Sequence, residues 1–130
     1  MKQISLMDKY PVNELTVAKE ATRFNSIDEI MTYLKGKVDE HPVATYIACF
    51  NHYEHTQTLE DKKINPTILD AQNIIFCFGK EIPNPAILAV RPRAIGVVER
   101  ADDFVLTFMD APNSKLHDVM VSWVNSVVNR

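Results

Sequence analysis

The residues with the clearest chemical potential form the run Cys49-x-x-His52-x-x-His55, which follows an apolar segment. Thiolate and imidazole groups suit zinc, iron or copper. Cys49 and His52 face opposite sides of a continuing strand, because side chains alternate along it. They converge only if the chain turns into a helix after Asn51, which also brings His52 and His55 together. With Cys77 as a fourth ligand, these residues would form a site for zinc or another transition metal.

The same run also has a simpler interpretation, a buried thiol and two solvent-facing histidines at a strand end. No second Cys-x-x-Cys pair supports a metal site. A Cys–His nucleophile would need an accessible thiolate close to an imidazolium or a helix N-terminus. Cys49 lies in mid-strand between Ala48 and Phe50, and no nucleophile elbow or oxyanion loop is present. The sequence therefore favours binding over catalysis, with a metal- or thiol-dependent redox protein as the alternative function.

A second polar group surrounds Asn84-Pro85, where an N-cap residue precedes a proline suited to the first helical position. Arg91 and Arg93 follow and could bind a carboxylate or a phosphate. The alternative is a turn with two solvated arginines, since the three glycines of the chain make no phosphate-cradling loop. The possible polar site therefore comprises Asn51, His52, His55, Arg91 and Arg93.

Two amphipathic helices are predicted to position these residues. Ser26 and Glu29 have the form of a capping box, and the apolar residues behind them repeat at the spacing of one helical face. This helix should end by Glu40, because Pro42 disfavours helical geometry before it. The second helix is predicted to open at Pro112-Asn113-Ser114 and to follow the same apolar period to the end of the chain.

Strands are predicted over residues 15–20, 43–51, 73–79, 93–100 and 104–110, the last two as a hairpin. Residues 1–13 lack clear periodicity and are interpreted as an irregular N-terminal arm. Two helices can cover only one face of a sheet of four or five strands. The predicted fold is therefore a two-layer α+β sandwich with a mainly antiparallel sheet, formed as a single domain of residues 1–130.

The alternation of side chains assigns the two faces of this sheet. The face under the helices is expected to hold Tyr46, Phe50, Ile74, Phe76, Phe78, Phe104, Leu106 and Phe108. The opposite face is expected to hold Ile47, Cys49, Ile75, Cys77, Val105, Thr107 and Met109. A face so apolar is seldom left open on a soluble protein. We expect a second copy of the chain, residues 1–13 or an apolar ligand to cover it, and we predict a homodimer.

The composition limits the class of protein. The net charge of −3 over 130 residues leaves no electrostatic footprint for nucleic acid and no Lys/Arg block for a membrane surface. No apolar run reaches the length of a signal peptide core or a membrane span. We therefore expect a cytoplasmic protein with no nucleic-acid or membrane partner, in which Cys49 and Cys77 are thiols.

Three short motifs lie in the order of a known group of domains. They are the strand end Asn51-His52, the turn Asn65-Pro66-Thr67 before Ile74–Gly79, and the hairpin close Met109-Asp-Ala-Pro112. With them, residues 26–112 resemble a widespread group of small uncharacterised bacterial and archaeal α+β domains. Those domains are similar to the TATA-binding-protein-like architecture in fold only.

The resemblance has three departures. Asn51 replaces an aspartate that the group pairs with histidine, Lys80-Glu-Ile-Pro83 intervenes before Asn84-Pro85, and a Gly-Thr that follows in the group is absent. The group has no settled activity, so the resemblance implies a fold and singles out His52. The sequence as a whole predicts a self-associating domain that binds a small molecule or a protein partner. This function requires no cofactor.

Overall fold

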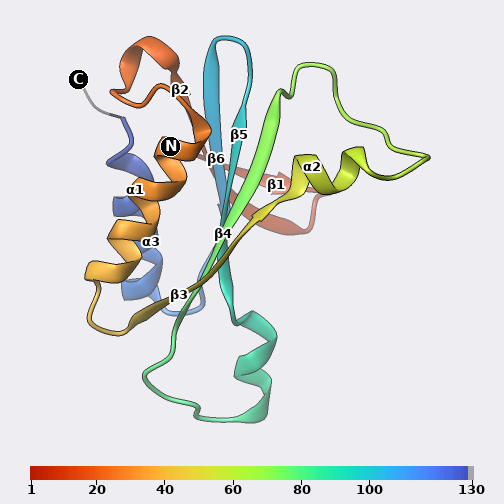
Figure 1. Cartoon of the computed structure of the whole chain (residues 1–130). Helices are drawn as coiled ribbons and strands as arrows, with labels where there is room; N and C mark the ends of the chain where they lie inside the picture. Colours follow the sequence, from red (N-terminus) through yellow and green to blue (C-terminus); the bar gives the residue numbers. More distant parts are fainter. Residues whose placement is uncertain (129–130) are drawn as a thin grey trace.

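The computed structural model describes residues 1–128 and contains one antiparallel sheet with helices on one side (Figure 1). Its strands are β1 (Lys2–Leu6), β2 (Tyr10–Ala18), β3 (Ala44–Asn51), β4 (Asp70–Phe78), β5 (Arg93–Glu99) and β6 (Asp103–Met109). Their spatial order is β1-β2-β6-β5-β4-β3, and every neighbouring pair is antiparallel. The predicted α+β class is confirmed.

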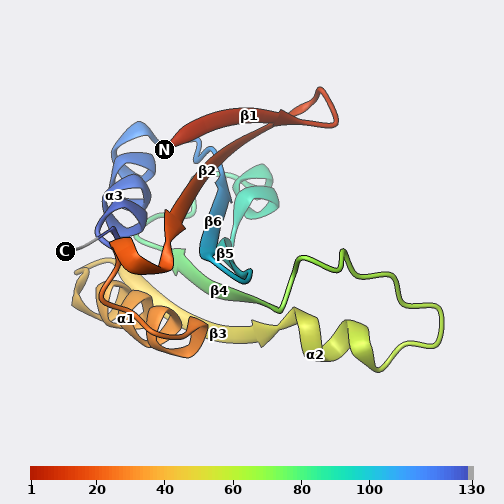
Figure 2. The same ribbon diagram turned by 90° about the horizontal axis from the view of Figure 1, so that it is seen from above.

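The helices form the second layer of the fold. Helices α1 (Ile27–Glu40) and α3 (Ser114–Asn125) lie on the same face of the sheet (Figure 2). A short helix α2 (His52–Gln57) follows β3, and 3-10 turns η1 (Lys19–Ala21) and η2 (Pro85–Val90) occupy two connections. Among the described residues, no helix is both long and apolar enough to cross a membrane.

Both long helices begin where their capping residues predict. Ser26 Oγ accepts a hydrogen bond from the Glu29 amide at 3.2 Å, while Glu29 reaches back to the Asn25 amide at 2.8 Å. Asn113 Oδ1 accepts from the amides of the second and third residues of α3, Lys115 at 2.9 Å and Leu116 at 3.2 Å. Each cap satisfies amides that the first helical turn leaves unpaired.

The sheet has six strands rather than four or five, and the extra strand comes from the N-terminal segment. β1 and β2 form a hairpin that turns at Met7 and Asp8, both in left-handed backbone conformation with φ of 56°. The predicted irregular arm over residues 1–13 is therefore wrong. β1 buries none of its side chains, so it lacks the apolar alternation that reveals a strand in a sequence.

The core lies between the sheet and the two long helices. Phe76 of β4 and Phe104 of β6 are fully buried there. Trp123 of α3 stacks on Phe78 with ring centroids 5.6 Å apart and meets Phe76 edge-on at 5.5 Å. These aromatic contacts fix α3 against the end of β4.

A β-bulge in β3 decides which of its side chains face the helices. Tyr46 pairs with Phe76 and Ala48 with the next residue of β4, so Ile47 is an extra residue. The extra residue reverses the alternation of side chains beyond it. Cys49 consequently pairs with buried Ile74 and faces the helices, whereas Phe50 faces the other side and is 39% exposed. The predicted faces of Cys49 and Phe50 are both wrong, because the prediction assumed a regular strand.

Candidate functional site

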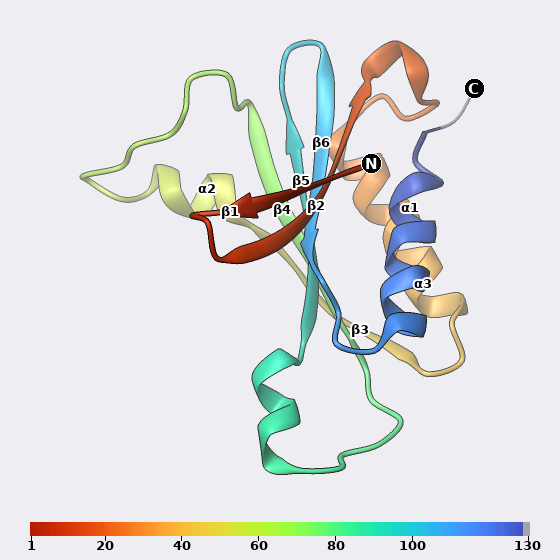
Figure 3. The ribbon, with the colours of Figure 1, turned by 180° about the vertical axis from the view of Figure 1, so that it is seen from behind.

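The sheet face turned away from α1 and α3 has no helical layer over it (Figure 3). We call it the open face. Strand pairing places one row of residues across its middle, each opposite the next: Glu14, Thr107, Gly96, Asn73 and Phe50. Of the residues predicted for this face, Ile75, Cys77, Val105, Thr107 and Met109 lie on it, and Ile47 is exposed at the bulge.

The centre of the open face is polar and is built around Gly96. A Cβ at Gly96 would lie 3.1 Å from Asn73 Oδ1 and 3.2 Å from Thr107 Oγ1, so both oxygens lean over the glycine. Neither side chain forms a hydrogen bond to another described residue. A glycine inside a strand is a signal of such a close approach, so Gly96 is the residue of the sequence that could have located this centre. Unpaired polar groups inside an apolar surround are typical of a binding surface.

Exposed apolar side chains gather on the open side of the molecule. The β1–β2 hairpin and the segment between α2 and β4 project beyond the sheet on the side away from α1 and α3 (Figure 2). Among the described residues, no large exposed hydrophobic side chain belongs to α1 or α3. Apart from Met1, they are Leu6, Met7 and Tyr10 in the hairpin, Ile47 and Phe50 in β3, Leu59 and Leu69 around the projecting segment, Ile82 and Leu88 around η2, and Met109 in β6.

The chain does turn into a helix after β3, as convergence of the two histidines required. Asn51 caps α2 by accepting a hydrogen bond from the Glu54 amide at 2.9 Å. The rings of His52 and His55 have centroids 6.4 Å apart, and each contacts Phe50 at 5.4 and 5.7 Å. The structure thus groups His52 and His55 with Phe50 instead of Cys49.

The possible polar site predicted from the sequence is divided between the two ends of the sheet. Asn51 pairs with Gln72 at one end of β4, whereas Arg93 pairs with Phe76 four residues further along. Four residues of strand span roughly 13 Å. Arg91 and Arg93 therefore lie apart from Asn51 and the two histidines.

The predicted metal ligands are not brought together. Cys49 Sγ donates to Gln72 Oε1 at 3.2 Å in a groove of about 240 Å³ between α1 and β3. Cys77 pairs with Thr45 near the other end of β3 and lies on the open face. Within residues 1–128, no three His, Cys, Asp or Glu side chains are placed to hold a metal ion. The predicted ligand set of Cys49, His52, His55 and Cys77 is therefore wrong.

The environment of Cys49 makes its thiol hard to ionise. Cys49 is exposed, but the partial burial of its thiol raises its pKa, and the carboxylates of Asp28 and Asp70 raise that pKa further. Gln72 holds both carboxylates close, donating to Asp28 at 3.0 Å and to Asp70 at 3.2 Å. Cys49 is therefore a poor nucleophile at neutral pH, since the thiolate is the reactive form.

In a Cys77→Ser variant, we expect iodoacetamide to alkylate Cys49 several-fold more slowly at pH 7.5 than in the urea-unfolded chain. A raised pKa leaves less thiolate at that pH, so the difference should shrink as the pH rises past the folded pKa. Mass spectrometry of the Cys49 peptide gives both rates. Equal or faster alkylation of the folded chain would contradict the assigned environment.

Comparison with known proteins gives a family and no function. No curated protein and no solved structure matches the chain. One family covers residues 1–129 and is described as a family of unknown function, DUF6858. This match spans both layers of the fold, from β1 of the N-terminal hairpin to the last residues after α3. The chain therefore belongs to the family of unknown function DUF6858.

Proposed function

We propose that the chain is a non-catalytic binding domain that self-associates, with a second copy covering the open face. The observation that carries this proposal is the one-sided distribution of exposed apolar side chains. Large contiguous apolar patches on soluble proteins usually mark interaction sites. Here the large exposed apolar side chains lie on the open side and on the segments that project around it, while α1 and α3 present none of them among the described residues.

The accessible surface area of the folded chain is large enough to include an interface with a protein partner. Its accessible surface is 8120 Å² for a mass of 14.8 kDa. A compact monomer of that mass would expose about 7,000 Å². The excess of roughly 1,100 Å² exceeds the ~800 Å² that each partner contributes to a standard interface. We take a second copy as the occupant because closed two-fold dimers are the commonest oligomers.

The polar centre gives such a dimer its register. Asn73 and Thr107 would each need a hydrogen-bond partner once water is excluded, because a buried unpaired polar group costs about 1–3 kcal/mol. A two-fold axis close to Gly96 would place these groups opposite their own counterparts in the second copy. We further propose a cytoplasmic location, which suits the two free cysteines.

The solution mass tests this function. We expect a species of twice the chain mass of 14.8 kDa at micromolar concentration, measured by sedimentation equilibrium or light scattering. Thr107→Arg, at the centre of the open face, should raise the dissociation constant by about 100-fold or more and give monomers.

Thr32→Arg is the matched control, because it makes the same substitution on the exposed surface of α1. It should leave the dimer intact. A wild-type chain that is monomeric throughout the micromolar range would refute the proposal, and equal dissociation in both variants would refute the open face as the interface.

A further inference from the structure

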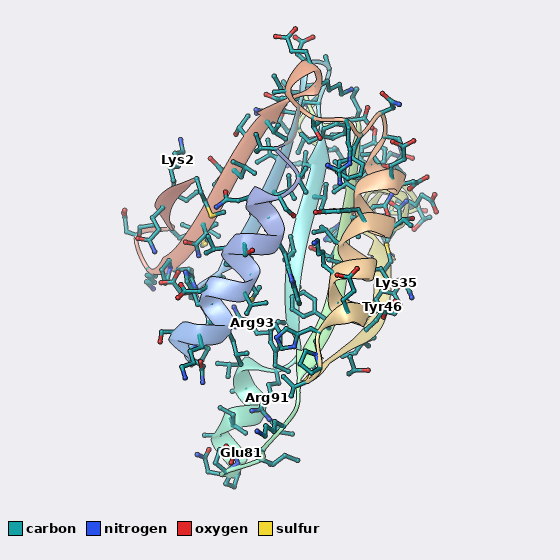
Figure 4. The ribbon with its side chains drawn as sticks, turned by 90° about the vertical axis from the view of Figure 1, so that its left-hand side faces the viewer. Lys2, Lys35, Tyr46, Glu81, Arg91 and Arg93 are labelled. Carbon is teal, nitrogen blue, oxygen red and sulfur yellow. The ribbon has the colours of Figure 1, made fainter. Side chains whose placement is uncertain are left out.

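A second candidate site lies at the end of the sheet far from α2. A half-open cavity of about 60 Å³ lies there between η2, the end of β4 and the start of α3. Its wall includes the apolar side chains of Phe78, Ile87, Val90 and Leu116. Arg91 and Arg93 bring the charge to this cavity. Figure 4 shows Arg93 at the lower end of α3, above Arg91 and the segment that contains η2.

Arg93 has donors that the chain leaves unused. Its Nη2 donates to the carbonyl oxygens of Met109 and Asp110. Its Nε is buried and has no acceptor, and its Nη1 forms no hydrogen bond within the described chain. A donor buried without an acceptor is destabilising, so Arg93 is placed where an added acceptor would be favourable.

The charge of Arg93 is also unmatched. None of the ion pairs within the described chain includes Arg93. The carboxylate of Asp110 acts on Arg93 only from beyond ion-pair distance and is itself hydrogen-bonded to Asn13 at 2.8 Å. Burial lowers the pKa of the Arg93 guanidinium. A partly buried cation in apolar surroundings normally has an anionic partner.

The other polar groups of the cavity are available to assist. Arg91 donates through Nη1 to the Glu81 carbonyl oxygen at 2.6 Å, which anchors its guanidinium and leaves its remaining donors free. Asn113 lines the cavity as well, and its side-chain oxygen caps α3. No Asp or Glu side chain lines this cavity. The site therefore presents donors and positive charge to a molecule that is otherwise in contact with hydrocarbon.

We propose that this cavity binds a short-chain aliphatic monocarboxylate, with its carboxylate on Arg93 and Arg91 and its hydrocarbon against Phe78, Ile87 and Leu116. Guanidinium donors match the two oxygens of a carboxylate. A phosphate would set its remaining charged oxygens against the apolar wall, where they lose hydration. A cavity needs roughly 10–15 Å³ for each water-sized group that it holds. The cavity of about 60 Å³ therefore holds about four to six non-hydrogen atoms. That is the size of propionate or butyrate.

This site can be tested separately from the proposed dimer. Arg93 pairs with Phe76, whose side chain is buried under the helices, and the cavity lies at the end of the sheet, between α3 on one side and the η2 segment on the other (Figure 3). The η2 segment borders both sites, but their tests are separable, because Thr107 does not line the cavity and Arg93 is not among the exposed apolar residues.

The chain contains a built-in probe of this cavity. Trp123 is the one tryptophan of the sequence, and its indole stacks on Phe78, which lines the cavity. We expect titration with butyrate to change its fluorescence saturably, with a midpoint in the millimolar range or below. Inorganic phosphate carries only the negative charge and 1-butanol only the hydrocarbon chain. Neither should give a saturable change in the Trp123 fluorescence.

Arg93→Gln should weaken butyrate binding about 10-fold or more, because it removes a charge-assisted contact. Arg23→Gln is the matched control, since Arg23 stacks over Phe24 and Tyr33 away from the cavity, and it should bind as the wild type does. If Arg93→Gln does not fold, Arg91→Gln and the cavity-filling Ala111→Leu take its place, with the same loss expected.

Three results would overturn the proposal: no saturable response to propionate or butyrate, a response to phosphate as strong as that to butyrate, or unchanged affinity in the folded cavity variants.

Discussion

Replacing Phe76 by alanine should lower the free energy of unfolding by about 3–5 kcal/mol, the cost of removing a fully buried aromatic side chain. Phe76 has no exposed surface and contacts the rings of Phe78 and Trp123. Its loss leaves a cavity where the end of β4 meets α3. A protein of this size is stable by about 5–15 kcal/mol, so one substitution would remove a large share of that stability. Urea denaturation followed by Trp123 fluorescence measures the change.

Phe50→Ala is the matched control, and it tests the bulge as well as the core. Phe50 is 39% exposed on the open face, although regular alternation in β3 predicts that it is buried under the helices. Measured under conditions in which the chain is monomeric, Phe50→Ala should cost less than about 1 kcal/mol. A cost equal to that of Phe76→Ala would show that Phe50 is a core residue and that β3 has no bulge at Ile47.

The elements that the sequence could predict are those whose signals are local. Ser26 and Asn113 are capping side chains that act within one turn of their helices, so both starts follow from a few neighbouring residues. The hairpin of β5 and β6 was likewise predicted close to its observed bounds. Each of these features is decided by residues that are near in sequence.

The features that the sequence could not predict depend on pairing between distant residues. β1 exists because its backbone pairs with β2, and its mostly polar, exposed side chains leave no periodic signal. The bulge at Ile47 is visible only once β4 is alongside, because Val43–Asn51 alone reads as a regular strand. The likeness to the TATA-binding-protein-like architecture stays a prediction, since no solved structure matches the chain.

The bulge residue Ile47 accounts for most of the difference between the predicted and the observed candidate site. The extra residue in β3 moves Cys49 to the helical side and leaves Cys77 on the open face. That separation removes the basis of the predicted metal and thiol chemistry. The same change brings Phe50 beside His52 and His55. The open face therefore gains an aromatic edge and keeps one of its two predicted thiols.

Deleting Ile47 should leave the protein folded, with a loss of stability below about 2 kcal/mol. Ile47 has no partner in β4, and its side chain is 50% exposed. Deleting Ile75 from the opposite strand should instead abolish folding. Circular dichroism during thermal unfolding compares the two variants directly.

The two deletions differ in effect because side chains alternate between the two faces of a strand with a period of two residues. Without Ile47, Tyr46 is followed directly by Ala48, and regular alternation keeps Ala48 opposite Ile75 and Cys49 opposite Ile74, as in the native pairing. Without Ile75, one half of β4 must turn its side chains to the wrong face. Either Phe76 and Phe78 or Ile74 and Gln72 then leave the core, and two aromatic residues alone represent about 6–10 kcal/mol.

Alkylation of Cys49 tests whether β3 keeps the same two faces when Ile47 is deleted. In a folded variant without Ile47, the thiol should still face α1 and react as slowly as in the wild type. If that variant unfolds, or if its Cys49 reacts as fast as in the urea-unfolded chain, then the extra residue is required for the faces of β3. In that case the bulge would be an essential element of the fold. The native pairs on both sides of Ile47 argue for the first outcome, because they already have the register of a strand that lacks it.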